Sequence, residues 1–237
     1  MNRNRLGLSG IEVSAVGMGT LTMGFSQKNL STDEGARIIV HAVKSGINFL
    51  DTAQYYDTYR YLRPALDTIK SDENLDMPVV CSKTLESDYE SASAAVDECL
   101  SELNLEKIDI FLLHEVRGVV DLHERSEAWR ALRETSGLIR AIGISTHHVD
   151  ACLEAANLDS CDVVFPLINK AGMGIRDGEG PGTRDEMAEA IKLCSNHGVG
   201  VFTMKAFGGG NIIEDYVECL NYATSLEGVD AVMIGMG

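Results

Sequence analysis

Short runs of apolar and β-branched residues recur at roughly even intervals along the chain. The eight runs occupy residues 14–18, 47–50, 79–82, 108–113, 139–144, 163–167, 200–204 and 231–234. Strands buried on both faces carry nearly continuous apolar runs, whereas strands with one solvated face alternate apolar and polar positions. The pattern therefore predicts eight strands of a parallel sheet.

Amphipathic patterns with the spacing of an α-helix separate these runs. The first opens at Ser31, an N-cap residue followed by acidic residues, and stops at Ser45-Gly46. The same pattern covers residues 91–103, 126–135, 149–156, 184–197 and 213–225. A strand–helix unit repeated with eight strands predicts an α/β protein, either a (β/α)8 TIM barrel or an unusually large doubly wound sheet. No G-x-G-x-x-G motif follows the first run, which weakens the dinucleotide-binding form of the doubly wound alternative.

Two segments depart from this alternation. Residues 5–13 predict a β-hairpin around Ser9-Gly10 ahead of the barrel, and residues 171–183 form a glycine-rich loop after the sixth strand. No linker interrupts the chain, so we expect one domain over residues 1–237. The sequence stops just after the eighth strand. We therefore expect a C-terminally incomplete barrel without its last helix and tail, and an uncovered apolar groove that favours self-association.

Composition and charge narrow the possible functions. The chain has 237 residues, 45% of them hydrophobic, and its 36 acidic against 20 basic residues give a formal charge of -16. This charge disfavours binding to nucleic acid or to an anionic membrane surface. No apolar run is long enough for a membrane span, and the N-terminus opens no signal-peptide core. The six cysteines form no C-x-x-C pair, which indicates buried thiols in a reducing, cytoplasmic environment and no metal site.

Polar residues directly follow most of the predicted strands. They are Asp51, Lys83, His114, Ser145, Asn169 and Lys205. In a (β/α)8 barrel the carboxyl ends of the strands form the mouth of the active site, so these side chains are expected to converge there. Taken singly, each has a simpler interpretation as a cap, a solvated charge or, for Asp51 and Lys83, a structural ion pair.

The same residues carry a resemblance to the aldo-keto reductase family. It begins in the segment around Leu6-Gly7 and Ser9-Gly10, continues through Asp51-Thr52-Ala53-Gln54-Tyr55-Tyr56, and includes Lys83 and His114. The resemblance runs from about residue 4 to the end of the chain. It implies a barrel whose hairpin plugs the bottom, and a catalytic set of Asp51, Tyr56, Lys83 and His114 that reduces a small-molecule carbonyl by hydride transfer.

The chemistry of these four residues is consistent with that reaction. Tyr56 would be the general acid, since carbonyl reduction builds negative charge on an oxygen that must receive a proton. We expect Lys83 to lower the pKa of Tyr56 from its usual value near 10, and Asp51 to keep Lys83 charged. A neutral His114 would donate a second hydrogen bond to the carbonyl.

The resemblance also implies a nicotinamide cofactor, NADPH or NADH. Ser145 and Asn169 match the positions that hold the carboxamide in this family, while Lys205 and the glycines Gly208, Gly209 and Gly210 would approach the pyrophosphate. The simpler interpretation of the glycines is a flexible loop. Met204 stands where many members have an aromatic residue.

The strand at Met204 is similar to that of a subgroup in which a ferredoxin-like iron–sulfur tail can follow the barrel, but no such cysteine cluster is present. Met204, the missing tail and Asp57, where glycine is common, leave a second hypothesis open. It is a catalytically impaired barrel that acts as a binding or regulatory subunit.

Overall fold

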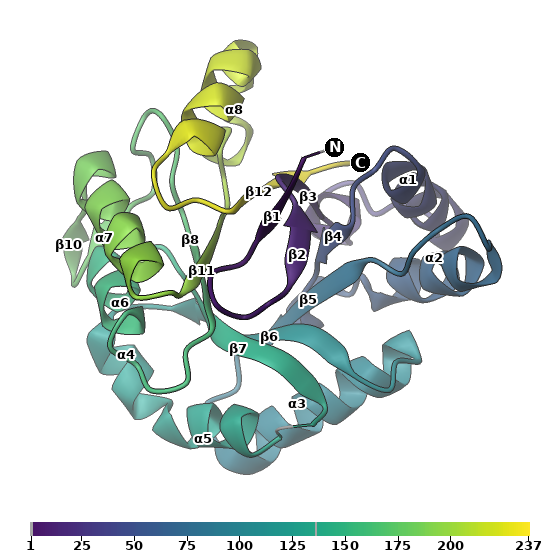
Figure 1. Cartoon of the computed structure of the whole chain (residues 1–237), viewed down its shortest axis with the longest axis horizontal. Coiled ribbons are helices and arrows are strands. Elements are labelled where there is room, and N and C mark those ends of the chain that lie inside the picture. Colours follow the sequence, from purple (N-terminus) through teal and green to yellow (C-terminus); the bar gives the residue numbers. More distant parts are fainter. Residues whose placement is uncertain (1, 136) are drawn as a thin grey trace.

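The computed structural model describes residues 2–135 and 137–237, and in them eight parallel strands close into a barrel (Figure 1). The strands are β3 (Val16–Gly19), β4 (Phe49–Asp51), β5 (Val79–Thr84), β6 (Ile108–Val116), β7 (Ile139–Thr146), β8 (Val163–Pro166), β11 (Gly200–Thr203) and β12 (Ala231–Gly235). They follow one another around the ring in chain order, and β12 pairs back onto β3. The prediction of a (β/α)8 barrel is confirmed, and each of the predicted strands is present.

Helices surround the barrel as an outer ring in Figure 1. They are α1 (Thr32–Lys44), α2 (Tyr59–Ser71), α3 (Tyr89–Leu103), α4 (Val119–Glu124), α5 (Ser126–Glu134), α6 (Val149–Ala155), α7 (Arg184–Asn196) and α8 (Tyr216–Ser225). The predicted cap of α1 is confirmed, since the Ser31 side chain accepts a hydrogen bond from the Glu34 amide. The segment predicted as one helix over 213–225 instead begins with a 3₁₀ turn at Ile213–Asp215.

Two helices were not predicted. Helix α2 contains Pro64, which lowers helix propensity and hides the pattern, although the helix still buries Tyr61, Leu62 and Leu66. Helix α4 spans only Val119–Glu124, too short for a periodic pattern to stand out.

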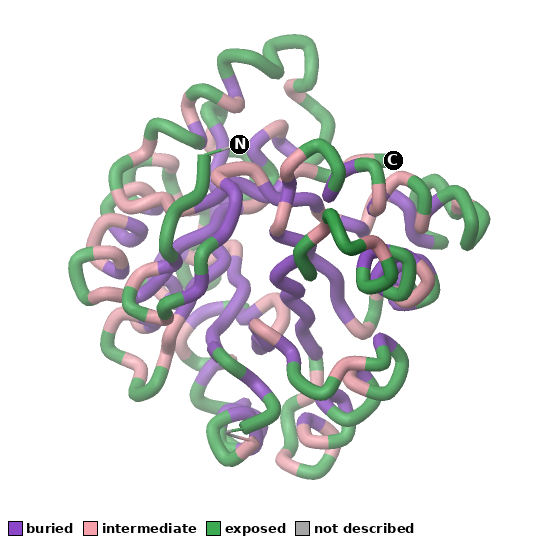
Figure 2. Tube along the Cα trace, turned by 45° about the vertical axis from the view of Figure 1, so that its right-hand side comes forward, coloured by how far each residue is buried: buried purple, intermediate pink, exposed green. Residues whose placement is uncertain are grey.

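The core has two layers because side chains on a strand alternate between its faces. Inward-facing residues such as Phe49, Ile110, Phe165 and Phe202 fill the barrel. Outward-facing residues of the same strands pack against the helices in a second, larger cluster. In Figure 2 the buried segments accordingly run through the middle of the molecule, while most exposed segments lie at its edge.

A hairpin of β1 (Arg3–Arg5) and β2 (Glu12–Ser14) lies across the centre of the ring in Figure 1. Leu6, Ile11 and Val13 of this hairpin are buried in the same cluster as the barrel interior. Gly7 has a φ of +48°, and a Cβ there would lie 2.3 Å from the Gly198 carbonyl oxygen, so only glycine fits. The predicted hairpin is confirmed, and it closes one end of the barrel.

The predicted glycine-rich loop and the end of the chain both contain local order. Two short strands, β9 (Arg176–Asp177) and β10 (Gly180–Pro181), pair within the loop. In the described part of the chain no helix follows β12. Val232 is nevertheless buried against Ala206 and Ala223, while Leu220, Val229 and Ile234 beside them are half-buried.

A repeated hydrogen bond ties together the strands at the end of the barrel where they begin. Around the ring, at every second gap between strands, an Asn or Asp side chain accepts from a backbone amide of the preceding barrel strand or, in one case, of the last residue of the hairpin. The pairs are Asn48 with Ser14 at 2.5 Å, Asp109 with Val80 at 3.0 Å, Asp162 with Ile142 at 2.9 Å, and Asp230 with Val201 at 2.9 Å. These amides lie at or near the strand starts, where the ladder between the main chains is incomplete, and the four side chains satisfy them.

Asp230 allows a test of this arrangement, because it also accepts from the Gly7 amide of the hairpin at 3.2 Å. Asp230→Ala should lower the free energy of unfolding by about 1–3 kcal/mol, since it leaves these amides without an acceptor. Asp230→Asn should be much milder or stabilising, because burial raises the pKa of Asp230 and its ionised form is therefore disfavoured in the fold. Urea unfolding monitored by circular dichroism measures both effects.

The sign of the pH dependence follows from the same shift. Asp230→Asn can be more stable than the unaltered protein only at pH values where Asp230 is ionised. The gain in free energy of unfolding should therefore shrink as the pH falls to about 4 and below. Asp76→Ala, on an exposed loop, is the control and should change little. Equal losses for Asp230→Ala and Asp230→Asn would contradict the role of the side-chain acceptor.

Candidate active site

Side chains at alternate positions of a strand point to the same face. Three of the predicted catalytic residues therefore point into the barrel, because each lies two positions after a residue of the barrel interior. Asp51 follows Phe49 by two positions on β4, Lys83 follows Cys81 on β5, and His114 follows Leu112 on β6. Each lies near the carboxyl end of its strand, the end opposite the hairpin. Tyr56 reaches the same place from a 3₁₀ turn, Gln54–Tyr56, that comes directly after β4.

The ammonium group of Lys83 is the centre of the site. Its Nζ lies 2.6 Å from Asp51 Oδ1 and donates a second hydrogen bond of 2.6 Å to the Thr52 carbonyl oxygen. Nζ also lies 4.8 Å from the centroid of the Tyr56 ring. Lys83 has no exposed surface. The fold therefore brings Asp51, Lys83 and Tyr56 together as predicted.

Burial and charge act against each other within this ion pair. Burial by itself lowers the pKa of Lys83, but Asp51, Tyr56 and Cys81 together oppose it, Asp51 most strongly, and the net pKa lies above the ordinary value. Burial raises the pKa of Asp51, and the charge of Lys83 opposes that rise. We conclude that Lys83 stays protonated and that Asp51 is the largest of the contributions that keep it so.

Tyr56 and His114 form the second contact of the site. The Tyr56 hydroxyl lies 3.2 Å from His114 Nε2, and the two rings are nearly perpendicular at 78°. Burial, together with the nearby charges of Lys83 and Arg125, lowers the pKa of His114 to about 2. The imidazole is therefore neutral at physiological pH, as predicted.

The unpartnered nitrogen of His114 indicates which tautomer is present. Among the described residues nothing hydrogen-bonds to the buried His114 Nδ1. A buried N–H without an acceptor is rarer than a buried acceptor without a donor, so the proton belongs on Nε2. His114 Nε2 then donates to the Tyr56 oxygen, which leaves the hydroxyl proton of Tyr56 available to another acceptor.

The predicted pKa shift of Tyr56 is wrong in its net direction. Burial raises the pKa of Tyr56 above its ordinary value; Lys83 lowers it as expected, but by less, and Asp51 adds to the rise. The ring is largely enclosed, and the positive charge of Lys83 is partly neutralised by Asp51. Tyr56 is consequently held in its protonated form.

A buried network of hydroxyl groups supports the loop that carries Tyr56, and the sequence alone did not reveal it. Thr20 donates to the Asp51 carbonyl oxygen at 2.9 Å, and the hydroxyls of Thr20 and Thr52 both contact the Thr58 hydroxyl, at 2.9 and 2.7 Å. All three threonines are fully buried. Their spacing in the sequence has no local pattern, because they meet only when β3 and β4 pair.

The predicted carboxamide-binding residues are buried at the same end of the barrel but already have partners. Ser145 Oγ accepts from the Glu115 amide at 2.9 Å. The side-chain amide of Asn169 both donates to the Met173 carbonyl oxygen and accepts from the Met173 amide, each at 2.9 Å. In this structure Asn169 therefore orders the loop that follows β8.

The predicted pyrophosphate-binding residues follow β11. Lys205 is exposed and has a φ of +59°. Gly208, Gly209 and Gly210 form a tight left-handed turn with φ between +58° and +98°, a conformation that favours glycine. The amides of Gly208 and Gly210 already donate to the carbonyl oxygens of Lys205 and Phe207. The segment is therefore an ordered turn.

The sequence predicts no metal site and no membrane-spanning segment, and the structure bears on both expectations only for the residues that it describes. In residues 2–135 and 137–237, no group of three or more His, Cys, Asp or Glu side chains is arranged to hold a metal ion. Within the same residues, none of the helices combines the length and the apolar character that crossing a bilayer demands.

Comparison with known proteins places this geometry in context. The sequence model of the Aldo/keto reductase family matches residues 15–235. The chain is 29% identical to the uncharacterized oxidoreductase YtbE of Bacillus subtilis (strain 168), over 81% of this chain and 63% of that protein. It is also 29% identical to morphine 6-dehydrogenase of Pseudomonas putida, over 87% of this chain and 63% of that protein. The chain thus spans less than two thirds of the length of these two curated relatives.

A solved structure shares the fold. The aldo-keto reductase of Bombyx mori, determined in complex with NADP, superposes with a TM-score of 0.74 at 16% identity, covering 98% of this chain and 83% of that one. At this identity the likeness establishes the barrel architecture alone.

Because the ion pair is buried, removing one of its two charges should destabilise the protein much more than removing both. Asp51→Asn should destabilise the protein by about 3–5 kcal/mol, because it leaves the Lys83 ammonium buried without a counter-charge. Adding Lys83→Met should restore most of that loss. Urea unfolding curves measure both variants.

A matched control for this experiment is the exposed pair of Arg63 and Asp67 on α2. Asp67→Asn should change the free energy of unfolding by less than about 1 kcal/mol. If Asp51→Asn lowered the free energy of unfolding as little as Asp67→Asn does, the pair of Asp51 and Lys83 would not be an ion pair buried away from water.

The lowered pKa of His114 predicts that the stability of the fold depends on pH. Its pKa of about 2 in the fold lies below its ordinary value of about 6.5, so between these values the unfolded chain binds one more proton and stability falls as the pH falls. His114→Gln should reduce this slope by about 1.4 kcal/mol per pH unit between about pH 4 and pH 6. Unfolding free energies of the two proteins across that range measure the difference, and parallel slopes would show that His114 titrates normally.

Proposed function

The chain belongs to the aldo/keto reductase family, and we propose that it reduces a small aldehyde or ketone with NADPH or NADH, using Tyr56 as the proton donor. The observation that carries this proposal is the contact between the Tyr56 hydroxyl and His114 Nε2 at 3.2 Å, next to the Lys83 ammonium. Two neutral hydrogen-bond donors beside a fixed positive charge suit an oxygen that becomes negative during reaction. The oxidoreductase names of the relatives agree with this class of reaction.

The raised pKa of Tyr56 suits an acid that works in the reductive direction. A protonated phenol is the form that can donate, and burial holds Tyr56 in that form. As the proton leaves, a phenolate forms beside Lys83, whose ammonium is already in place at 4.8 Å from the ring centroid. Lys83 therefore acts chiefly on the deprotonated state of Tyr56, and Asp51 keeps Lys83 charged and oriented.

His114 would orient the substrate rather than move a proton. Its pKa of about 2 prevents it from acting as an acid in its charged form at neutral pH. The Nε2 proton that now faces the Tyr56 oxygen can instead donate to a carbonyl oxygen placed beside both groups. The substrate carbonyl would then receive two hydrogen bonds, one of which becomes a proton transfer.

The residues at the rim fit a dinucleotide in part. The Ser145 oxygen accepts from Glu115, and its own O–H remains able to donate to a carboxamide. Asn169 would have to exchange its hydrogen bonds with Met173 for contacts to the nicotinamide. Lys205 and the left-handed turn of Gly208, Gly209 and Gly210 would hold the pyrophosphate. When bound, the nicotinamide supplies the hydride for the carbonyl carbon, and the NADP complex of the Bombyx mori protein supports this choice of cofactor.

Tyr56→Phe is the direct test of the proposal. It removes the proposed proton and keeps the ring against Lys83, so the turnover of 4-nitrobenzaldehyde with NADPH should fall by about 10²–10⁴-fold. The affinity for NADPH, measured by calorimetry, should stay within about threefold, because the proposal assigns the cofactor contacts to residues other than Tyr56. Absorbance at the nicotinamide band measures turnover.

The neighbouring tyrosine is a matched control. Tyr55 is 66% exposed, and Tyr55→Phe should leave turnover nearly unchanged. Unchanged turnover in Tyr56→Phe would remove Tyr56 as the acid. Tight NADPH binding without turnover in the unaltered protein would instead favour a binding or regulatory subunit.

A further inference from the structure

The strand that carries His114 is irregular at that position. The pairing of β6 with β7 shifts register between Leu113 and Val116, and Glu115 has a φ of +55°. An extra residue of this kind is a β-bulge, which changes the direction in which neighbouring side chains point. A non-glycine residue in the left-handed region is strained and persists only where its surroundings hold it. The aim of His114 toward Tyr56 therefore depends on whatever holds this bulge.

Two hydroxyl groups of β7 hold the bulge through its main chain. Ser145 accepts from the Glu115 amide at 2.9 Å, and Thr146 donates to the Val116 carbonyl oxygen at 2.6 Å. Neither of them contacts the carbonyl group of His114 itself. That carbonyl is bound by Arg125.

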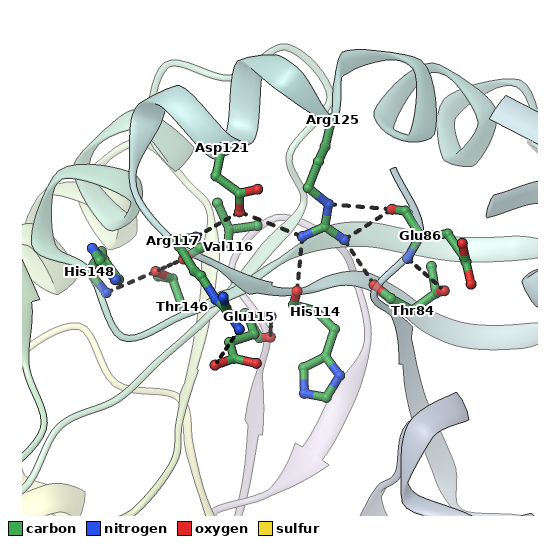
Figure 3. A network of polar contacts seen from close by, with 11 residues as sticks. Thr84, Glu86, His114, Glu115, Val116, Arg117, Asp121, Arg125, Thr146 and His148 are labelled. Carbon is green, nitrogen blue, oxygen red and sulfur yellow. Dashed lines mark hydrogen bonds and ion pairs between the residues drawn. The ribbon is translucent and has the colours of Figure 1, made fainter. Parts of the chain in front are cut away.

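Arg125 is the single residue between α4 and α5, and its guanidinium is buried, with 5% of the residue exposed. Nη1 donates to the His114 carbonyl oxygen at 2.9 Å, and Nη2 donates to the Thr84 carbonyl oxygen at 3.0 Å. Nε and Nη2 also donate to the Glu86 carbonyl oxygen at 3.3 and 3.2 Å. Figure 3 shows the guanidinium between the two strand ends. Arg125 thus joins the end of β6, beside His114, to the end of β5, one residue beyond Lys83.

The charge of Arg125 has little direct compensation. The carboxylate of Asp121 lies 3.9 Å from Nη1, beyond hydrogen-bond distance, and it accepts from the Arg117 amide at 2.8 Å. A buried cation that binds mainly to carbonyl oxygens is costly to keep, whereas an apolar side chain could fill the same space. The five fixed donors of a guanidinium can, however, bind carbonyls from two different strands at once.

We propose that Arg125 is a positioning residue for the reaction, one that holds the strained bulge of His114 and Glu115 in register with the strand end that carries Lys83. This inference rests on the proposed function. Arg125 does not reach the reacting groups; it acts through the main chain of His114. Without it, Glu115 would relax from its left-handed conformation and the His114 ring would turn away from Tyr56.

The test compares three variants of the full chain. Arg125→Met removes the donors and keeps an apolar side chain of similar length. Arg133→Met is the control on helix α5, which begins directly after Arg125, since Arg133 is exposed and pairs with Asp159 on the surface. The double variant Arg125→Met with Glu115→Gly relieves the strain, because glycine adopts a positive φ without steric cost.

The expected result separates positioning from simple stability. With 4-nitrobenzaldehyde and NADPH, Arg125→Met should lower kcat by about 10–100-fold with little change in KM, since displacing an aligned group by about 1 Å has effects of this size. Adding Glu115→Gly should recover at least about threefold of that loss, although glycine lowers general stability. Arg133→Met should match the unaltered protein. A merely structural role would leave the Glu115→Gly addition without benefit.

A second readout does not need turnover. The ¹⁵N shifts of the His114 ring and the hydrogen exchange of the Glu115 amide should change in Arg125→Met, return toward the original values in the double variant, and stay unaltered in Arg133→Met. If the unaltered protein reduces no carbonyl, the proposed function fails, and these spectra still test Arg125. Unchanged His114 shifts and Glu115 exchange in a folded Arg125→Met protein would overturn the positioning role.

Discussion

The ammonium group of Lys83 is the constraint on which this end of the barrel depends. A charge with no exposed surface needs a counter-charge and hydrogen-bond acceptors on every side that solvent would otherwise occupy. Asp51 and the Thr52 carbonyl meet that need, and the threonine hydroxyls beneath them hold the Asp51 main chain in place. The Tyr56 loop is ordered by the same contacts. Support for one buried cation thus also assembles the chemical site.

The two ends of the barrel are built differently. At the hairpin end, apolar side chains of the hairpin pack against the barrel interior and four side-chain acceptors bind amides at or near the strand starts. At the other end, Asp57 and Glu115 adopt left-handed torsions directly after Tyr56 and His114, and Lys205 does so after β11. Left-handed torsions at non-glycine residues thus directly follow two of the proposed catalytic residues, which is where backbone strain can aim a functional side chain.

Some of this could be predicted from the sequence, and the division has a physical basis. Strands and most helices follow from periodicity, and Asp51, Lys83 and His114 share one end of the barrel because they follow strands of one parallel sheet. The pKa of Tyr56 could not be predicted, because it depends on how completely the ring is enclosed. Arg125 and the three threonines were missed because their partners are main-chain atoms or hydroxyls distant in sequence, which leave no residue pattern.

Asp230 has a consequence for how the chain folds. It binds the hairpin through the Gly7 amide and, through its own carbonyl, the Asn4 side chain, contacts that span 223 and 226 residues. Ring closure between β3 and β12 spans a similar distance along the chain. The Gly7 amide is made 223 residues before its acceptor, so the plug cannot be secured until Asp230 has been synthesised. A nascent barrel therefore carries the apolar face of Leu6, Ile11 and Val13 without this attachment until the segment around Asp230 has emerged from the ribosome.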